Sequence, residues 1–230
     1  MSLCEKIPSL YPYAMAARQA YDFAHVDIPR TDTQAILFNH NKKKIIAFRG
    51  TTSLKDWKTN MNGGFVALRD QVVVREGFAD AWISVRDRVM NWVNGVQVHM
   101  TGHSLGGAIA TVAAVDIAPS HDVTLVTFGA PRALHETCPL HHRIQAYRVV
   151  NNNDVVPRLP PESAGYAHRG RLVYFTERGD MMTHISPWEK LRDRIEGRIG
   201  DFGELGTDGI KDHDMDEYVR LCAKRYGIDG

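Results

Sequence analysis

Residues 98–110 decide the fold, and they read Val98-His99-Met100-Thr101-Gly102-His103-Ser104-Leu105-Gly106-Gly107-Ala108-Ile109-Ala110. A strand-like run precedes a Gly-x-Ser-x-Gly turn, and a run of small residues typical of a packed helix follows it. Glycines on both sides of Ser104 avoid side-chain clashes with the strained backbone of such a turn. The stretch predicts an exposed, nucleophilic serine hydroxyl. The alternative is a turn that only packs a helix or binds an anion at a helix N-terminus.

Around this stretch, short runs rich in β-branched residues alternate with helical patterns, at residues 44–48, 77–93, 96–100, 105–117, 123–128 and 145–150. This alternation is typical of an α/β fold with a mainly parallel central sheet and helices on both faces. Two strand-like runs, 35–38 and 44–48, are separated only by a polar turn, which predicts a hairpin and an antiparallel N-terminal edge. Near the other end of the sequence, helical spacing predicts a helix that contains Tyr218, Leu221, Cys222 and Tyr226.

Composition excludes several classes of protein. The 230 residues are 43% hydrophobic and 24% charged, which is typical of a soluble globular chain, and one domain over residues 1–230 is expected. With a formal net charge of +1, the chain lacks the surplus of positive charge that is typical of nucleic-acid-binding proteins. Cys4, Cys138 and Cys222 are widely spaced and are expected to be free thiols, without a pair that would hold a metal.

Neither a leader nor a membrane span is expected. The first residues contain charges and no continuous apolar run, so no secretory signal is recognised. A cytoplasmic location is expected by default, and the alternative is a secreted protein whose leader is absent from this sequence. The longest uncharged run, residues 89–115, is long enough to cross a bilayer, but it contains asparagine, glutamine, histidine and four glycines. It is therefore interpreted as buried core and not as a transmembrane segment.

Four segments together resemble the class 3 lipases of the α/β-hydrolase fold. They are Phe48-Arg49-Gly50-Thr51-Thr52 with Trp57 after it, Gly102 to Gly107, Thr127-Phe128-Gly129-Ala130-Pro131-Arg132, and Arg148 to Pro161. The similarity runs in the family's order over about residues 35–220. The resemblance implies a serine carboxylic ester hydrolase that forms an acyl-enzyme on Ser104, with no metal and no organic cofactor.

A serine hydroxyl is a weak nucleophile, so it needs an imidazole to take its proton and a carboxylate to hold that imidazole. Asp154 follows the strand expected at 145–150, at the sheet edge that collects functional groups, although it could instead cap a turn beside three asparagines. His213 precedes the C-terminal helix and looks like the family's histidine-bearing turn. His184 is the second candidate, while His168 lies too close to the acid-bearing loop.

The oxyanion of the tetrahedral intermediate needs N–H donors. The backbone N–H of Leu105, directly after the nucleophile, supplies one. The resemblance assigns the other to Thr51, which could otherwise be an ordinary strand-end threonine.

Leu54, Trp57 and Met61 recur at helical spacing after this segment, near the place where related lipases carry a lid. They predict either a mobile lid that opens at a lipid–water interface or a fixed helix packed on the core.

The substrate class stays open at this point. A lipase that cleaves acylglycerols or related fatty-acyl esters is the first hypothesis. Short soluble esters, aryl esters of the feruloyl type and phospholipids are handled on similar scaffolds, because a fold does not fix a substrate. A non-catalytic module that binds lipids or esters is the hypothesis from a different class, and the presence of Ser104, Asp154 and a later histidine argues against it.

Overall fold

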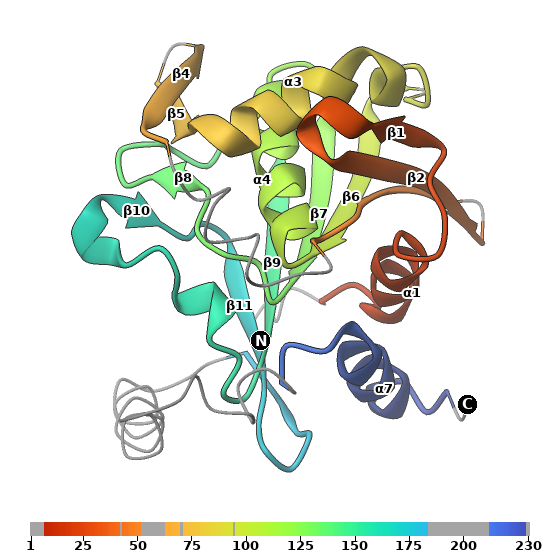
Figure 1. Cartoon of the computed structure of the whole chain (residues 1–230). Helices are drawn as coiled ribbons and strands as arrows, with labels where there is room; N and C mark the ends of the chain where they lie inside the picture. Colours follow the sequence, from red (N-terminus) through yellow and green to blue (C-terminus); the bar gives the residue numbers. More distant parts are fainter. Residues whose placement is uncertain are drawn as a thin grey trace.

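The computed structural model describes residues 7–41, 43–51, 63–69, 71–93, 95–183 and 212–228. Its main sheet has the order β1-β2-β3-β6-β7-β9-β11-β12 (Figure 1). The strands are β1 (Val26–Ile28), β2 (Thr33–His40), β3 (Lys43–Phe48), β6 (Gln97–His103), β7 (Asp122–Phe128), β9 (Ile144–Asn151), β11 (Arg171–Phe175) and β12 (Met181–Met182).

The five strands β3, β6, β7, β9 and β11 run parallel to one another, which confirms the mainly parallel sheet. The expected hairpin is also present, since β2 and β3 pair antiparallel with Ala35 opposite Phe48. Pairing continues to His40 opposite Lys43, so the strands are longer and the turn shorter than the polar residues 39–43 suggested. β12 adds a second antiparallel edge that the sequence pattern did not reveal.

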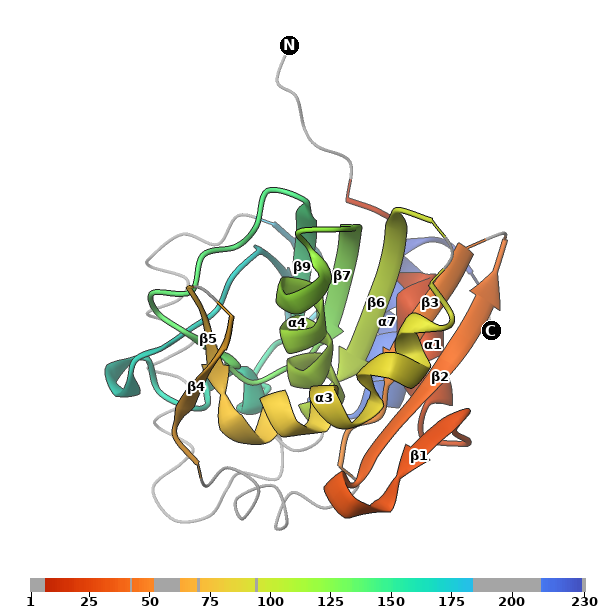
Figure 2. The same cartoon turned by 90° about the horizontal axis from the view of Figure 1, so that it is seen from above.

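Helices cover both faces of the sheet. Figure 2 shows α3 (Glu76–Met90) and α4 (Leu105–Ile117) on one face, and α1 (Tyr11–Gln19) and α7 (Met215–Arg225) on the other. Each pair packs on its own buried apolar cluster. Since α1 and α7 come from opposite ends of the described chain and contact each other, one face of the core depends on long-range docking.

Two of these helices position the site, and their sequences explain why they form. α4 is built mostly from small and β-branched residues and is buried nearly all round, as expected for a helix laid against a sheet. α7 begins at Asp214, whose side chain accepts a hydrogen bond from the N–H of Asp216 at 2.9 Å. Acidic residues in its first turn and basic residues in its last complement the helix dipole.

A smaller antiparallel sheet lies beside the main one, with the order β10-β8-β5-β4 (Figure 1). Its strands are β4 (Phe65–Arg69), β5 (Val72–Arg75), β8 (Leu134–His135) and β10 (Tyr166–Ala167). Short 3-10 turns occupy Pro29–Thr31, Val156–Arg158 and Glu162–Ala164. Within the described ranges, no helix combines the length and apolarity needed to cross a membrane. That residues 1–230 form one domain stays a prediction.

Candidate active site

Ser104 occupies the turn between β6 and α4. Its backbone is strained, with φ 54° and ψ −128°, and its N–H donates to the carbonyl of Phe128 at 2.9 Å. A side chain at Gly102 would collide with the backbone of Gly106, and one at Gly106 would collide with the carbonyl oxygen of Phe48. The two flanking glycines are therefore needed because the turn is packed backbone against backbone.

Asp154 lies just beyond β9, and β6, β7 and β9 are neighbours in the sheet. Parallel strands end at the same sheet edge, so Ser104 and Asp154 are brought to one side of the molecule. The carboxylate is 1% exposed, and its Oδ1 accepts the N–H of Val156 at 3.0 Å. Asp154 therefore caps a turn, which was the alternative considered from the sequence. It also forms hydrogen bonds with His213 and Tyr218.

The imidazole ring of His213 lies against the carboxylate of Asp154. Its Nδ1 lies 2.9 Å from Oδ2 and 3.0 Å from Oδ1 of Asp154. A carboxylate accepts, so Nδ1 carries a proton, and in the neutral ring the lone pair is therefore on Nε2. Nε2 is buried and has no hydrogen-bond partner among the described residues. The ring is therefore held in the tautomer that a general base requires.

Tyr218, on the first turn of α7, completes the shell around Asp154. Its hydroxyl donates to Oδ2 at 2.6 Å and accepts the N–H of Asn151 at 3.0 Å. Burial, and then the charge of Asp154, raise the pKa of Tyr218 well above its ordinary value, so the hydroxyl keeps its proton. Helical spacing predicted only a packing role for Tyr218. Its hydroxyl, a polar group on a helix face that is otherwise mostly apolar, was the feature of the sequence that could have indicated a hydrogen-bonding role.

His103, next to Ser104, links the two sides of the site. Its Nε2 donates to the backbone carbonyl of His213 at 2.7 Å, and its Nδ1 accepts the hydroxyl of Tyr21 at 2.7 Å. Burial, and then the neighbouring His213, lower the pKa of His103 well below its ordinary value. A neutral ring with both nitrogens engaged is suited to support and not to proton transfer.

The asparagines before Asp154 hold the chain that carries His213. Asn151 Nδ2 donates to the carbonyl of Asp212 at 3.1 Å. The backbone N–H of Asn153 and the side-chain amide of Asn152 donate to the Asp212 carboxylate at 3.1 and 3.4 Å. These contacts, between segments far apart in the chain, were not foreseen from the sequence.

Gly129, at the end of β7, lies against the Asp154–His213 pair. Its φ is +55°, and a Cβ there would lie 2.5 Å from Oδ2 of Asp154 and 2.9 Å from Nδ1 of His213. A side chain at this position cannot coexist with the pair in its present geometry, which is why only glycine fits.

The remaining expected site residues are placed differently. Leu105 is the first residue of α4. Thr51 follows Gly50, where a Cβ would lie 3.2 Å from Cβ of Ser104, and the Thr51 hydroxyl is buried without a hydrogen-bond partner in the described chain. Three candidates for a lid and the second candidate histidine lie outside the described residues, namely Leu54, Trp57, Met61 and His184.

His168 is not part of the pair. Its Nε2 donates to the carbonyl of Pro157 at 2.7 Å. Burial, and then the nearby Arg148, lower its pKa to about 3, so the ring stays neutral. Among the residues that the structure describes, no group of three or more His, Cys, Asp or Glu is arranged to hold a metal ion.

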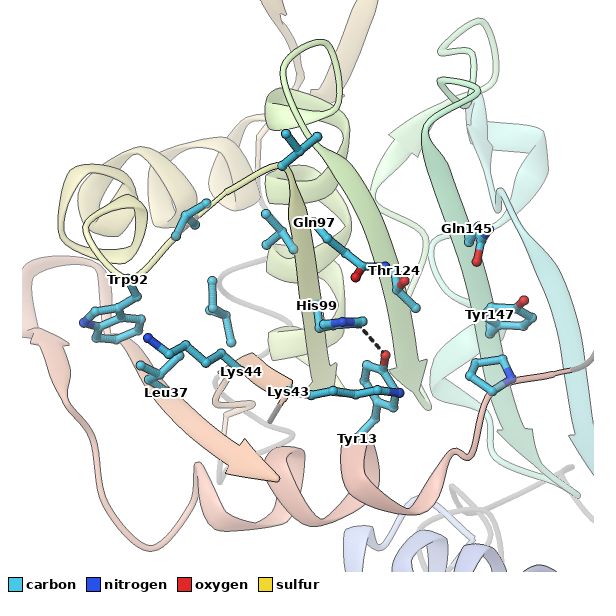
Figure 3. Close-up of a pocket in the computed structure, with 15 residues that line it drawn as sticks. Tyr13, Leu37, Lys43, Lys44, Trp92, Gln97, His99, Thr124, Gln145 and Tyr147 are labelled. Atoms are coloured by element: carbon cyan, nitrogen blue, oxygen red, sulfur yellow. Dashed lines mark hydrogen bonds between the residues drawn. The ribbon is translucent and has the colours of Figure 1, made fainter. Parts of the chain in front are cut away.

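A cavity of about 800 Å³ lies near the first residues of the central parallel strands, at the end opposite to Ser104. Figure 3 shows the side chains that line it. Its lining includes Tyr13 and His99, whose hydroxyl and Nδ1 are 2.8 Å apart. His99 precedes Ser104 by five strand residues, which is about 16 Å along β6. This cavity is therefore separate from the Ser104 turn.

Comparison with known proteins gives a consistent assignment. A family model described as Lipase (class 3) matches residues 45–164, just over half of the chain. A secreted mono- and diacylglycerol lipase 1 of Fusarium solani is 32% identical over 200 residues, covering 80% of this chain and 60% of that lipase. The secreted mono- and diacylglycerol lipase A of Penicillium cyclopium is 31% identical, covering 84% of this chain and 67% of that lipase.

Among solved structures, the native Rhizomucor miehei lipase propeptide complex superposes with a TM-score of 0.63 at 24% identity, covering 74% of this chain and 68% of that chain. At this identity the likeness supports the fold, and it confirms the α/β-hydrolase prediction.

The expected cytoplasmic location is wrong. It was inferred only from the first residues of the sequence, whereas the two lipases of Fusarium solani and Penicillium cyclopium described above are named secreted. Those names point to the outside of the cell. The composition of a folded domain carries no physical signal for the side of the membrane on which the protein works.

Proposed function

The chain belongs to the class 3 lipase family, and we propose that it hydrolyses fatty-acyl esters of glycerol through an acyl-enzyme on Ser104. One observation carries the proposal. His213 is fixed by both oxygens of Asp154, while its Nε2 is left without a partner in the described chain, at the sheet edge where Ser104 stands on a strained turn.

In the proposed reaction, Nε2 of His213 takes the proton of Ser104 as its hydroxyl oxygen attacks the ester carbonyl. Asp154 stabilises the imidazolium that forms. The tetrahedral oxyanion is bound by the N–H of Leu105 and the N–H of Thr51. One such donor typically lowers the free-energy barrier of acylation by about 3 to 4 kcal/mol. His213 then protonates the leaving alcohol, and water releases the fatty acid by the reverse sequence.

The relatives named mono- and diacylglycerol lipases support partial glycerides as the first substrates to test. Because the chain spans only about 60% of the Fusarium lipase, the substrate is a proposal for this chain and not a transfer. We also propose that the substrate is met at a lipid–water interface. If residues 54–61 act as a lid, activity rises sharply above the solubility limit of the ester, whereas smooth saturation through that limit argues against a lid.

Covalent labelling tests the chemistry. A fluorescent organophosphonate should label the wild-type chain and should not label Ser104→Ala. Equal labelling of both, or none of the wild type, would leave the non-catalytic binding module as the better hypothesis.

Substrate range is tested with mono-, di- and triacylglycerols and with chromogenic esters of increasing acyl length, using Ser104→Ala as the blank. Turnover of long-chain partial glycerides supports the proposal. Activity confined to the shortest esters, to feruloyl esters or to phospholipids would assign the chain to one of the alternative esterase classes.

A further inference from the structure

A second cavity, of about 500 Å³, lies between the β9–β11 pair and residues 157–169. Arg148 and Val150 line it from β9, and Leu172 lines it from β11, where it pairs directly with Arg148. Side chains alternate along a strand, so Arg148 and Val150 point away from the face that carries Tyr147 and Val149 in the α1–α7 core. Pro157 closes another side.

The guanidinium of Arg148 makes no ion pair within 4 Å in the described chain, although Glu162 lies near enough to favour its charge. Its Nε is buried without a hydrogen-bond partner, and no ion pair joins it to an acidic side chain within the described residues. Burial, and then the nearby Arg132, lower its pKa to about 10, so Arg148 is still charged at neutral pH. Arg148 is half-buried and faces the cavity, so a guanidinium whose Nε lacks a partner in the described chain offers its charge to an ion or ligand that enters there.

The neighbouring groups do not supply the missing charge. Glu162 pairs with Arg132 at 2.9 Å, and Arg132 also donates to the carbonyl of Pro160 at 2.9 Å. Asp154 borders the cavity, but its two oxygens accept hydrogen bonds from Val156, His213 and Tyr218. The cavity thus keeps a surplus positive charge at its wall.

We propose that this cavity binds a small fatty-acid carboxylate. Guanidinium and carboxylate match each other in charge and in planar geometry. Most of the lining is polar or charged, and Val150, Leu172 and Pro157 supply the apolar contacts for a short alkyl chain. A volume of about 500 Å³ is in the range of small-molecule sites. The site uses no atom of Ser104, although the cavity is bordered by Asp154 of the proposed triad.

Calorimetric titration of the full chain with hexanoate tests the proposal. Hexanoate should bind with a dissociation constant below about 10 mM, and hexanol, which has the same chain without the charge, should bind at least about tenfold more weakly. Arg148→Gln should weaken hexanoate about tenfold or more, while Arg148→Lys should recover part of the loss. Arg178→Gln, which removes an exposed arginine away from the cavity, should have no effect.

Three results would overturn the proposal. They are no hexanoate binding below about 10 mM, equal affinity for hexanoate and hexanol, and unchanged hexanoate affinity in Arg148→Gln. Inorganic phosphate is titrated as well, since a guanidinium also binds phosphate. If phosphate competes with hexanoate and binds with equal or higher affinity, the fatty-acid proposal is wrong and the cavity binds oxyanions in general. The comparison of hexanoate with hexanol in the wild type remains decisive if Arg148→Gln does not fold.

Discussion

The two halves of the site are held in place in different ways. The nucleophile half, residues 97–117, is one continuous strand, turn and helix, and its geometry comes from the backbone and two glycines. The acid–base half, Asp154 with His213, joins residues 59 positions apart through buried side-chain hydrogen bonds. The first half is set by local sequence, whereas the second exists only when α7 docks on the sheet. Substitutions should therefore distinguish a loss of catalytic activity from a loss of the packing of α7 on the sheet.

Removing the base gives the largest expected effect. His213→Ala should lower kcat by about 10⁴-fold or more, because Ser104 then has no proton acceptor. Circular dichroism should still show cooperative thermal unfolding, since the nucleophile half and the sheet are untouched. His184→Ala is the matched control and should retain most activity. The reverse pattern would mean that the other histidine is the base.

A methyl group at Gly129 should break the acid–base half without changing either of its members. Gly129→Ala must place a Cβ 2.5 Å from the Asp154 carboxylate at a φ of +55°. We expect kcat to fall by about 10² and the free energy of unfolding to fall by about 2 to 4 kcal/mol. Urea unfolding and ester hydrolysis measure both. Gly64→Ala, whose Cβ would meet nothing within 4 Å, should leave both unchanged, and a fully active Gly129→Ala would refute the placement of the pair.

Tyr218→Phe tests how much of the pair depends on α7. The change removes one donor from Asp154 and leaves the N–H of Asn151 without its acceptor. A loss of about 1 to 3 kcal/mol in stability and about tenfold in kcat is expected. Tyr226→Phe removes a hydroxyl that donates to the carbonyl of Pro8, so it should cost stability but not activity. Equal effects of the two variants on kcat would contradict a positioning role for Tyr218.

The last expected effect concerns the dependence of stability on pH. His103 is neutral and buried, so its folded pKa lies below the unfolded value of about 6.5. Below that pH the unfolded chain binds a proton that the folded chain does not, and stability is lost as pH falls, by about 1.4 kcal/mol per pH unit. His168 acts with the same sign down to a pKa of about 3. Urea titrations between pH 7 and 4 should give a shallower dependence of stability on pH for His103→Gln than for the wild type, and an equal dependence in the two chains would contradict a neutral, buried His103.

The sequence predicted the elements that have local causes. β6, the Ser104 turn and α4 follow from residues 98–110 alone, and the hairpin, β7 and β9 follow from short β-branched runs. The small sheet and β11 were not predicted, because their strands are short and pair with partners distant in the chain. Residue types and order were enough to name Ser104, Asp154 and His213 as candidates. Their assignment as a catalytic triad stays a prediction until the variants are measured.

By itself, the sequence determined the α/β class and the strained serine turn, because backbone conformation and hydrophobic periodicity act over a few residues. The family came from the resemblance of four motifs to known lipases. Only the tertiary structure decided which side chains meet. It placed Tyr218 on Asp154, His103 on the chain of His213, Gly129 beside the pair, and Arg148 in a cavity wall with its Nε unpaired in the described chain. Hydrogen bonds, burial and unpaired charge are properties of atoms brought together from distant segments, and no local pattern encodes them.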